Sequence, residues 1–206
     1  MAHEEQDQEK DVKEKILEVA KKLFATKGFE GTSVRQICEE AGVALALVSY
    51  HFGGKDKLLY ALFEPLNEHF AKLSYNLDEP ADALQKYIHG FVAYRYENEE
   101  LIHILQQEMM MQSPRLKMLS NAYYPSWVHL RAILEAGKQQ GVFHFESIIH
   151  TVHFVMGAVI FSRQNRFLDP VFSDLPPMED HSLHAAEYII QLVFNGLHTS
   201  LPQQRG

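Results

Sequence analysis

The chain has 206 residues, of which 46% are hydrophobic and 22% are charged, and its formal net charge is -8. This composition supports a sizeable folded core and excludes collagen-like, intrinsically disordered and disulfide-scaffold proteins. A single cysteine cannot form an internal disulfide, and there is no apolar amino-terminal run, so we expect a protein of the reducing cytoplasm. No apolar stretch reaches the roughly 18 residues of a membrane span, so no membrane partner is expected.

The amino-terminal part of the chain changes character near residue 12. Residues 1–11 are polar and charged, which predicts a disordered lead-in. From Val12 the apolar residues recur at the helical period until Gly28, which predicts a first helix that braces the next segment. Residues 12–60 carry eight Lys or Arg against six Asp or Glu. The acidity therefore lies mainly outside this region, and local charge decides whether phosphate is attracted.

The most informative stretch of the sequence runs from Thr32 to Lys55. Its first half places apolar residues on one face of a short helix, for which Thr32 is the predicted cap and Ser33 the alternative. Gly42 is predicted to end this helix, because the residue after the last turn often needs a positive φ. A second short helix is expected from Val43. Two short helices joined by a glycine turn form a helix-turn-helix, whose second helix lies in the major groove of DNA.

These elements resemble the amino-terminal domain of tetracycline-repressor-type (TetR family) regulators. The segments KGFEGTSVRQI, AGV, YHF and GGKDKL stand in the family's order within residues 16–63, about a quarter of the chain. The resemblance implies an all-α protein with a three-helix helix-turn-helix DNA-binding domain at residues 12–60. Residues 61–206 would form a larger helical domain for ligand binding and dimerisation. It also implies a regulator and not an enzyme, and the sequence contains no GxSxG, HExxH or phosphate-binding glycine loop.

The resemblance further implies which residues contact DNA. Arg35 would reach DNA from the first of the two short helices, and residues 44–49 would form the exposed face of the recognition helix. Tyr50, His51 and Lys55 would hold the phosphate backbone. Tyr50 and His51 could instead be core residues, and Lys55 could be an ordinary solvated helix start. The full set of residues predicted to bind DNA is Thr32, Ser33, Arg35, Ala44, Leu45, Ala46, Leu47, Ser49, Tyr50, His51 and Lys55.

The predicted reading face departs from the family's pattern because it is apolar. Many members carry polar residues where this chain has Ala44, Leu45 and Leu47. Such side chains can touch thymine methyl groups but cannot make bidentate hydrogen bonds to guanine or adenine. We therefore expect Arg35, methyl contacts and DNA shape to carry much of the specificity.

The rest of the sequence predicts further helices. A long helix is expected over residues 58–73, with a bend near residues 61–65 at Pro65. The other predicted helices cover residues 81–96, 99–111, 114–140 with an interruption near Pro125, 146–166 and 181–201. An acidic, proline-rich linker is expected at residues 169–180, between the last two helices.

The last two predicted helices are apolar over more surface than one neighbour can cover. This pattern and the family resemblance predict a homodimer that sets two recognition helices on a pseudo-palindromic operator. The alternative is that both helices only close the core of the monomer. The residues predicted to form the dimer interface are Val152, Val155, Met156, Val159, Ala186, Ile189, Ile190 and Val193.

The middle of the chain concentrates aromatic and methionine side chains, which suit a concave, mostly apolar ligand site. A plain core is the alternative. The residues predicted to line a pocket are Tyr94, His103, Gln106, Met109, Met110, Tyr123, Trp127 and Phe161. Together these observations predict a homodimeric repressor that a small hydrophobic or aromatic ligand releases from its operator. The alternative is a DNA-binding protein or activator of the same fold without an inducer.

Histidine is abundant in the sequence, but no metal site and no cofactor are predicted. Two pairs, His150 with His153 and His181 with His184, have helical spacing. Neither pair is accompanied by the thiolate or carboxylate ligands of a recognised zinc pattern.

Overall fold

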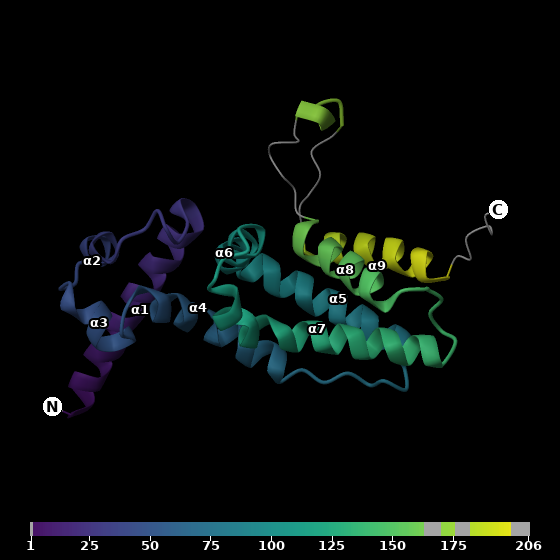
Figure 1. Cartoon of the computed structure of the whole chain (residues 1–206), viewed down its shortest axis with the longest axis horizontal. Coiled ribbons are helices and arrows are strands. Elements are labelled where there is room, and N and C mark those ends of the chain that lie inside the picture. Colours follow the sequence, from purple (N-terminus) through teal and green to yellow (C-terminus); the bar gives the residue numbers. More distant parts are fainter. Residues whose placement is uncertain (1, 163–169, 176–181, 199–206) are drawn as a thin grey trace. The chain divides into compact units, whose positions relative to one another are not determined.

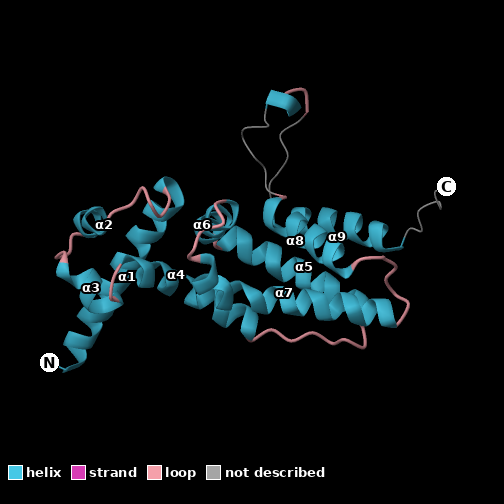
Figure 2. Cartoon of the chain, viewed as in Figure 1, coloured by secondary structure: helices cyan, strands magenta, loops and turns pink. Residues whose placement is uncertain are grey.

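The computed structural model describes residues 2–162, 170–175 and 182–198. These residues form helices joined by loops, with no strand among them (Figure 2). The prediction of an all-α protein is therefore confirmed. Within the same ranges, no helix is both long enough and apolar enough to cross a membrane. His181 and half of the predicted linker, residues 169 and 176–180, lie outside the described residues. The other half, residues 170–175, forms a short turn.

The helices follow one another along the chain as labelled in Figure 1. In order they are α1 (Ala2–Lys27), α2 (Val34–Ala41), α3 (Ala46–Phe52), α4 (Lys55–Ala71), α5 (Pro80–Glu97), α6 (Glu99–Met110), α7 (Leu116–Gln139), α8 (Ile148–Phe161) and α9 (Ser182–His198). They divide into two compact units. The first unit comprises Met1–Lys72 and Asn98–Pro125, and the second comprises Leu73–Glu97 and Ser126–Gly206.

Helix α1 begins at Ala2 and so includes the segment that we predicted to be a disordered lead-in. Two ion pairs at the spacing of four residues lie on this polar part of the helix. The Nζ atoms of Lys10 and Lys13 are 3.8 Å and 3.3 Å from the carboxylates of Glu14 and Glu9. Such pairs stabilise a helix by a few tenths of a kcal/mol each, on the order of 0.3–0.5 kcal/mol, without any apolar contact. Apolar periodicity begins only at Val12, so by itself it predicts too late a start for this helix.

The first unit also holds more of the chain than the predicted domain at residues 12–60. Helix α6 and the beginning of α7 belong to it, and α6 packs on α1. Gln107 of α6 donates a hydrogen bond of 3.0 Å to the carbonyl of Ala25, and Lys21 pairs with Glu100 at 3.7 Å. These contacts join segments about 80 residues apart in sequence, which no local pattern indicates.

Neither internal proline ends its helix. Helix α4 continues through Pro65, and α7 continues through Pro125. The interruption predicted near Pro125 is therefore not found, although the boundary between the two units falls directly after this residue. A proline costs one backbone hydrogen bond, which packing on neighbouring helices offsets here.

The core of the first unit is built from one apolar face of each of its helices. Helix α1 contacts α2, α4 and α6, and α3 packs on α4. The fully buried apolar side chains include Ile16, Ala20, Phe24, Ile37, Val48, Leu58, Leu59 and Phe63. Helices α2 and α3 have only eight and seven residues, too few to be stable alone, so this packing holds them in place.

The second unit is a bundle in which α5 lies beside α8 and α9 (Figure 1). Tyr87 is buried at its centre, with its hydroxyl 2.8 Å from Ser126 Oγ and 3.1 Å from Met156 Sδ. Burial raises the pKa of this phenol well above its usual value, so it stays protonated. Gly137 is needed in the last turn of α7, because a Cβ there would collide with the ring of Phe143.

Candidate functional site

The first short helix of the helix-turn-helix is capped at both ends. The amide of Gln36 donates a hydrogen bond to Ser33 Oγ at 3.2 Å, and Gln36 Oε1 accepts one from the amide of Ser33 at 3.4 Å. This reciprocal arrangement is a capping box. At the other end Gly42 has φ 67°, and its amide reaches back to the carbonyls of Cys38 and Glu39. The predicted glycine stop is confirmed, and Ser33, the alternative cap, is the one used.

Thr32 has a different role from the two that the sequence predicted. Its side chain is buried, and its Oγ1 lies 2.9 Å from the carbonyl oxygen of Gly28 and 3.2 Å from that of Leu23. The hydroxyl thus bonds to the backbone in the last turn of α1 and directly after it. Thr32 fastens the start of α2 to α1, and its side chain is not available to DNA.

Helix α3 presents a mostly apolar outer face, as the sequence predicted. Its Val48 is fully buried, while Leu45 and Tyr50 are 57% and 75% exposed. Ala44, Ala46 and Ser49 are also exposed, and Leu47 is half-buried. Helix α3 begins at Ala46 and not at Val43, because the Val43 amide still bonds to the Cys38 carbonyl of the preceding turn. The exposure of Tyr50 also excludes the alternative that it is a core residue.

Arg35 lies exposed at the start of α2, where DNA contact was predicted. Its Nε donates a hydrogen bond of 2.8 Å to Glu39 Oε1, and this carboxylate raises the pKa of the guanidinium. Both side chains are exposed, so the pair contributes little to stability and can be exchanged for another anion. A phosphate that approaches Arg35 competes with Glu39.

The structure assigns His51 to the interior, in agreement with the alternative reading and not with a phosphate contact. Its side chain is only 3% exposed, and its ring lies against Tyr50 with ring centroids 4.8 Å apart. Its Nδ1 is 3.6 Å from the nearest carboxylate oxygen of Glu9, which is beyond hydrogen-bonding distance. No hydrogen-bond partner for this atom occurs among the described residues.

Lys55 is likewise engaged within the protein. Its Nζ donates hydrogen bonds of 2.8 Å to the carbonyl oxygens of both Phe29 and Thr32. The same ammonium lies 4.0 Å from the centroid of the Phe29 ring, in a cation–π contact. Lys55 therefore ties the loop between α1 and α2 to the first residue of α4, and its contact with DNA phosphate stays a prediction.

The opposite side of the same loop contacts a cluster of charged residues that the sequence analysis missed. We call Phe29, Glu30, Glu108, Ser113 and Arg115 the Arg115 cluster. Arg115 lies over the Phe29 ring with its Cζ 3.9 Å from the centroid, and its Nη1 donates to Glu30 at 2.8 Å. Its Nε donates to Glu108 at 2.9 Å, and the Ser113 hydroxyl donates to the same carboxylate. Glu108 is buried, so this pair is largely withdrawn from water. Glu30 and Arg115 are 85 residues apart, and no sequence motif joins them.

The residues predicted to form the dimer interface mostly lie inside the second unit. Val155, Met156 and Val159 of α8, and Ala186, Ile189 and Val193 of α9, are buried within the chain. Val152 and Ile190 are half-buried. The predicted residues therefore belong to the core of the chain, where α8 and α9 pack on α5 and on each other. When a helix is apolar on two sides, its sequence does not show which side packs inside the chain.

A different stripe of the same two helices is left uncovered. We call it the α8–α9 outer face, and each of its members is at least half exposed. It consists of Phe154 and Phe161 of α8 and Tyr188 and Leu192 of α9, while Ile149 and Leu183 are exposed on another side of the same helices. So many large apolar side chains on adjacent helices indicate an interaction surface.

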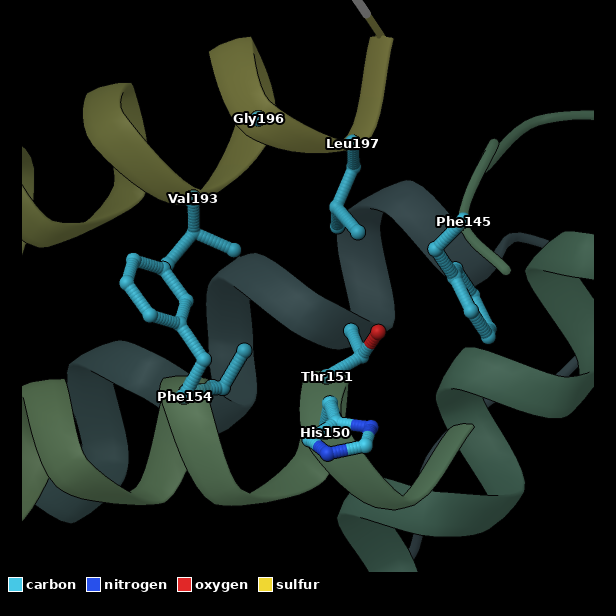
Figure 3. A pocket seen from close by; sticks show the side chains of 8 residues that line it. Phe145, His150, Thr151, Phe154, Val193, Gly196 and Leu197 are labelled. Carbon is cyan, nitrogen blue, oxygen red and sulfur yellow. The ribbon is translucent and has the colours of Figure 1, made fainter. Parts of the chain in front are cut away.

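A small hollow lies next to this face, between the beginning of α8 and the end of α9 (Figure 3). Its volume is about 250 Å³, and Phe154 is part of both the hollow and the outer face. The rest of the lining comes from His150, Thr151 and Val155 of α8, from Val193, Gly196 and Leu197 of α9, and from Phe145 of the loop before α8. The α8–α9 outer face is therefore contoured and not flat.

The residues predicted to line a ligand pocket are divided between the units. His103, Gln106, Met109, Met110 and Tyr123 belong to the first, and Tyr94, Trp127 and Phe161 to the second. Met110 is 76% exposed, whereas Tyr94 is buried. Neither unit by itself assembles the full predicted set.

The pair formed by His150 and His153 has ordinary neighbours. His150 Nδ1 is 2.8 Å from Ser147 Oγ, and His153 packs edge-on against Trp127. In the described parts of the chain no group of three or more His, Cys, Asp or Glu is arranged to hold a metal ion.

Known proteins resemble both parts of the chain. A family model described as bacterial regulatory proteins of the tetR family matches residues 16–62. A second model, described as the tetracyclin repressor-like C-terminal domain, matches residues 80–188. The two matches therefore extend the likeness from the helix-turn-helix to most of the chain.

Individual relatives agree with these matches. The transcriptional repressor NicS of Pseudomonas putida is 30% identical over 165 residues, which cover 75% of this chain and 76% of NicS. The probable transcriptional regulator YttP of Bacillus subtilis is 28% identical over 62% of this chain and 65% of its own length. The crystal structure of HlyIIR, a hemolysin II transcriptional regulator, is 32% identical with a TM-score of 0.73, covering 93% of this chain and 99% of HlyIIR.

Proposed function

Because the chain belongs to the TetR family of bacterial transcriptional regulators, and is thus a DNA-binding regulator and not an enzyme, we propose that it acts as a homodimeric repressor on a pseudo-palindromic operator. The observation that carries this proposal is the exposed face of α3, held in place by a fully buried Val48. Ala44 and Leu45, which directly precede α3, and Ala46, its first residue, suit thymine methyl groups in the major groove. Tyr50 and Ser49 add hydroxyl groups for the phosphate backbone, and Arg35 adds a charge.

The α8–α9 outer face supports the homodimer. A second copy would cover Phe154, Leu192 and their neighbours by presenting the same surface, as a two-fold interface requires. Such a dimer places two copies of α3 on successive major grooves, about 34 Å apart along the DNA. The interface residues are then those of the outer face, in place of the buried stripes that the sequence suggested.

Release by a small hydrophobic or aromatic ligand is the second part of the proposal. Helix α6 carries His103, Gln106, Met109 and Met110 of the predicted pocket. The same helix bonds to α1 through Gln107 and to the loop before α2 through the Arg115 cluster. Because these are direct hydrogen bonds within one unit, a ligand that shifts α6 also shifts the base of the helix-turn-helix.

The DNA part is tested by selecting binding sites from random duplex DNA with the purified full-length protein. We expect inverted repeats whose half-sites are one helical turn apart, with few guanine contacts from α3. We also expect affinity to fall steeply with salt, because phosphate contacts release counterions. Enrichment of single, non-repeated sites would contradict the homodimeric arrangement.

The ligand part is tested with the selected operator. A thermal-shift screen of hydrophobic and aromatic compounds is followed by operator-binding titrations with each compound that raises the melting temperature. We expect at least one compound to stabilise the protein and weaken operator binding. If no compound does both, the chain is a regulator of the same fold without an inducer.

A further inference from the structure

A larger hollow lies wholly within the first unit. It is bordered by α1, the end of α3, α4 and the beginning of α7, and its volume is about 720 Å³. Leu17, Phe52, Tyr60 and Met118 form its apolar wall. A hollow of this size is in the range of small-molecule sites, which combine apolar walls with a few polar groups. None of these residues is among those predicted from the sequence to line the ligand pocket, although Met118 lies in the same methionine-rich part of the chain.

The charged groups around this hollow are mostly positive. Lys13, Lys57 and Lys117 line it, and Glu64 is the one carboxylate among the described residues that line it. Lys13 is paired with Glu9 at 3.3 Å. Among the described residues, the ammonium groups of Lys57 and Lys117 have neither an ion pair nor a hydrogen bond. Two unneutralised lysines at one hollow attract an anion.

His51 supplies an independent indication of a ligand. It lines the hollow, its side chain is 97% buried, and its Nδ1 lacks a hydrogen-bond partner in the described chain. Buried polar atoms are normally satisfied, because leaving one without a partner costs roughly 1–3 kcal/mol. The nearest charged oxygen, on Glu9, is 3.6 Å away and too distant to meet this need. A polar group bound in the hollow would satisfy this nitrogen.

We propose that this hollow binds a small organic anion. Its carboxylate or phosphate group pairs with Lys57 and Lys117, and its apolar body lies along Leu17, Phe52 and Met118. The partial exclusion of water strengthens the charge pairing relative to an exposed site. The apolar wall discriminates against inorganic ions, which have no apolar surface to bury.

Occupancy of this site would act directly on the reading helix. His51 and Phe52 are the last two residues of α3, so a ligand here touches the same helix whose outer face carries the proposed DNA contacts. A ligand that binds one orientation of α3 more tightly shifts the population towards that orientation. This regulatory consequence rests on the proposed function, whereas binding of the anion does not.

Binding is tested by isothermal titration calorimetry of the full chain with four probes: decanoate, decyl phosphate, decanol and inorganic phosphate. We expect decanoate, decyl phosphate or both to bind with one site per chain, and the comparison of the two identifies the preferred head group. Decanol and inorganic phosphate should bind at least about tenfold more weakly, because decanol has no negative charge and inorganic phosphate has no apolar chain. Equal binding of decanol and decanoate, or no binding of either anion, would overturn the proposal.

The position of the site is tested with lysine variants and with the NMR signals of the His51 ring. K57M together with K117M should weaken binding of the organic anion by about tenfold or more, while K72M, which removes an exposed lysine outside the hollow, should not. Because all three lysines are exposed, unchanged circular dichroism is expected. In protein labelled with ¹⁵N-histidine, the His51 ring signals, assigned with H51Q, should shift on addition of the anion. Unchanged affinity in the double lysine variant, or an unshifted His51 signal at saturation, would place the anion elsewhere and overturn the site.

The regulatory consequence is measured separately. Operator affinity is determined with and without saturating anion, and we expect a change of about fivefold or more in either direction. If the anion binds but operator affinity does not change, the coupling to α3 is wrong and the site remains. If the protein binds no DNA while the anion still binds, the proposed function fails and the site again remains.

Discussion

The two compact units join their helices by different kinds of contact. In the first, the loop between α1 and α2 is held by directed polar contacts, from Lys55 on one side and Arg115 on the other. In the second, α5, α8 and α9 meet mainly through apolar side chains such as Val155, Val159 and Ile189. The second unit also leaves six large apolar side chains uncovered on α8 and α9.

This difference matches what each unit has to do in the proposed regulator. Hydrogen bonds and ion pairs depend on angle and distance, so they set the orientation of the short helices α2 and α3. Apolar burial is nearly indifferent to direction and proportional to area, so it suits an association surface. We therefore expect substitutions at the polar contacts of the first unit to lower its stability, and substitutions on the outer face of the second unit to weaken dimer formation.

The largest effect is expected on the α8–α9 outer face. F154D combined with L192D places two charges where a second copy would bury apolar surface, at a cost of about 2 kcal/mol or more for each site. We expect the double variant to be a folded monomer by sedimentation velocity and circular dichroism, and to lose operator affinity. V128D alters an equally exposed apolar residue of α7 and serves as the control. A double variant that still dimerises would move the interface to another surface.

The next largest effect is expected in the Arg115 cluster. E108A leaves a largely buried guanidinium without its main partner and should lower the free energy of unfolding by about 3 kcal/mol. E135A breaks an exposed Arg–Glu pair of the same 2.9 Å length and should cost less than about 1 kcal/mol. Both are measured by urea denaturation. Equal losses would show that burial does not distinguish the two pairs.

Lys55 provides a somewhat smaller test of the same unit. K55M removes two charged hydrogen bonds to the loop between α1 and α2 and should lower the free energy of unfolding by about 2 kcal/mol. K57M changes a nearby lysine that makes no such bonds and should leave stability unchanged. If K55M instead preserves stability and reduces the salt dependence of operator binding by about one ion, Lys55 is a phosphate contact after all.

The smallest effect concerns the pH dependence of the second unit. Burial lowers the pKa of His129 below its usual value of 6.5. As the pH falls through 6.5, the unfolded chain takes up a proton that the folded protein does not, so the free energy of unfolding decreases. We expect H129F to reduce this loss between pH 7.5 and 5.5 in urea denaturation. An identical pH dependence in both proteins would show that His129 takes up a proton equally well in the folded state.

Local chemistry made much of the first unit predictable. Ser33, which the sequence offered as the alternative cap of α2, forms a capping box with Gln36. Gly42 adopts the expected positive φ. The apolar character of the reading face also followed from residue types alone, because Ala44, Leu45 and Ala46 carry no polar side-chain atom, and the structure leaves Leu45 and Tyr50 exposed.

The polar site residues were less predictable. Thr32, His51 and Lys55 were each predicted to contact DNA, yet each is engaged with or packed against the protein itself. The residue type shows which kinds of group a hydroxyl or an ammonium can bond to. It does not show which of these groups lies next to it in the folded protein. That depends on where Phe29 and the end of α1 lie, which is a matter of tertiary packing.

The sequence by itself determined most of the helices, the helix-turn-helix and the family. These follow from apolar periodicity, helix caps and motif order, which depend on residues close together in the chain. Only the tertiary structure decided which apolar stripe of α8 and α9 is core and which is outer face, and which lysines are bound and which are free. Burial and ion pairing depend on neighbours that are distant in sequence, such as Glu30 and Arg115. For that reason lysine has two different roles only two positions apart. Lys55 is hydrogen-bonded inside the protein, whereas Lys57 is a proposed contact for an anion.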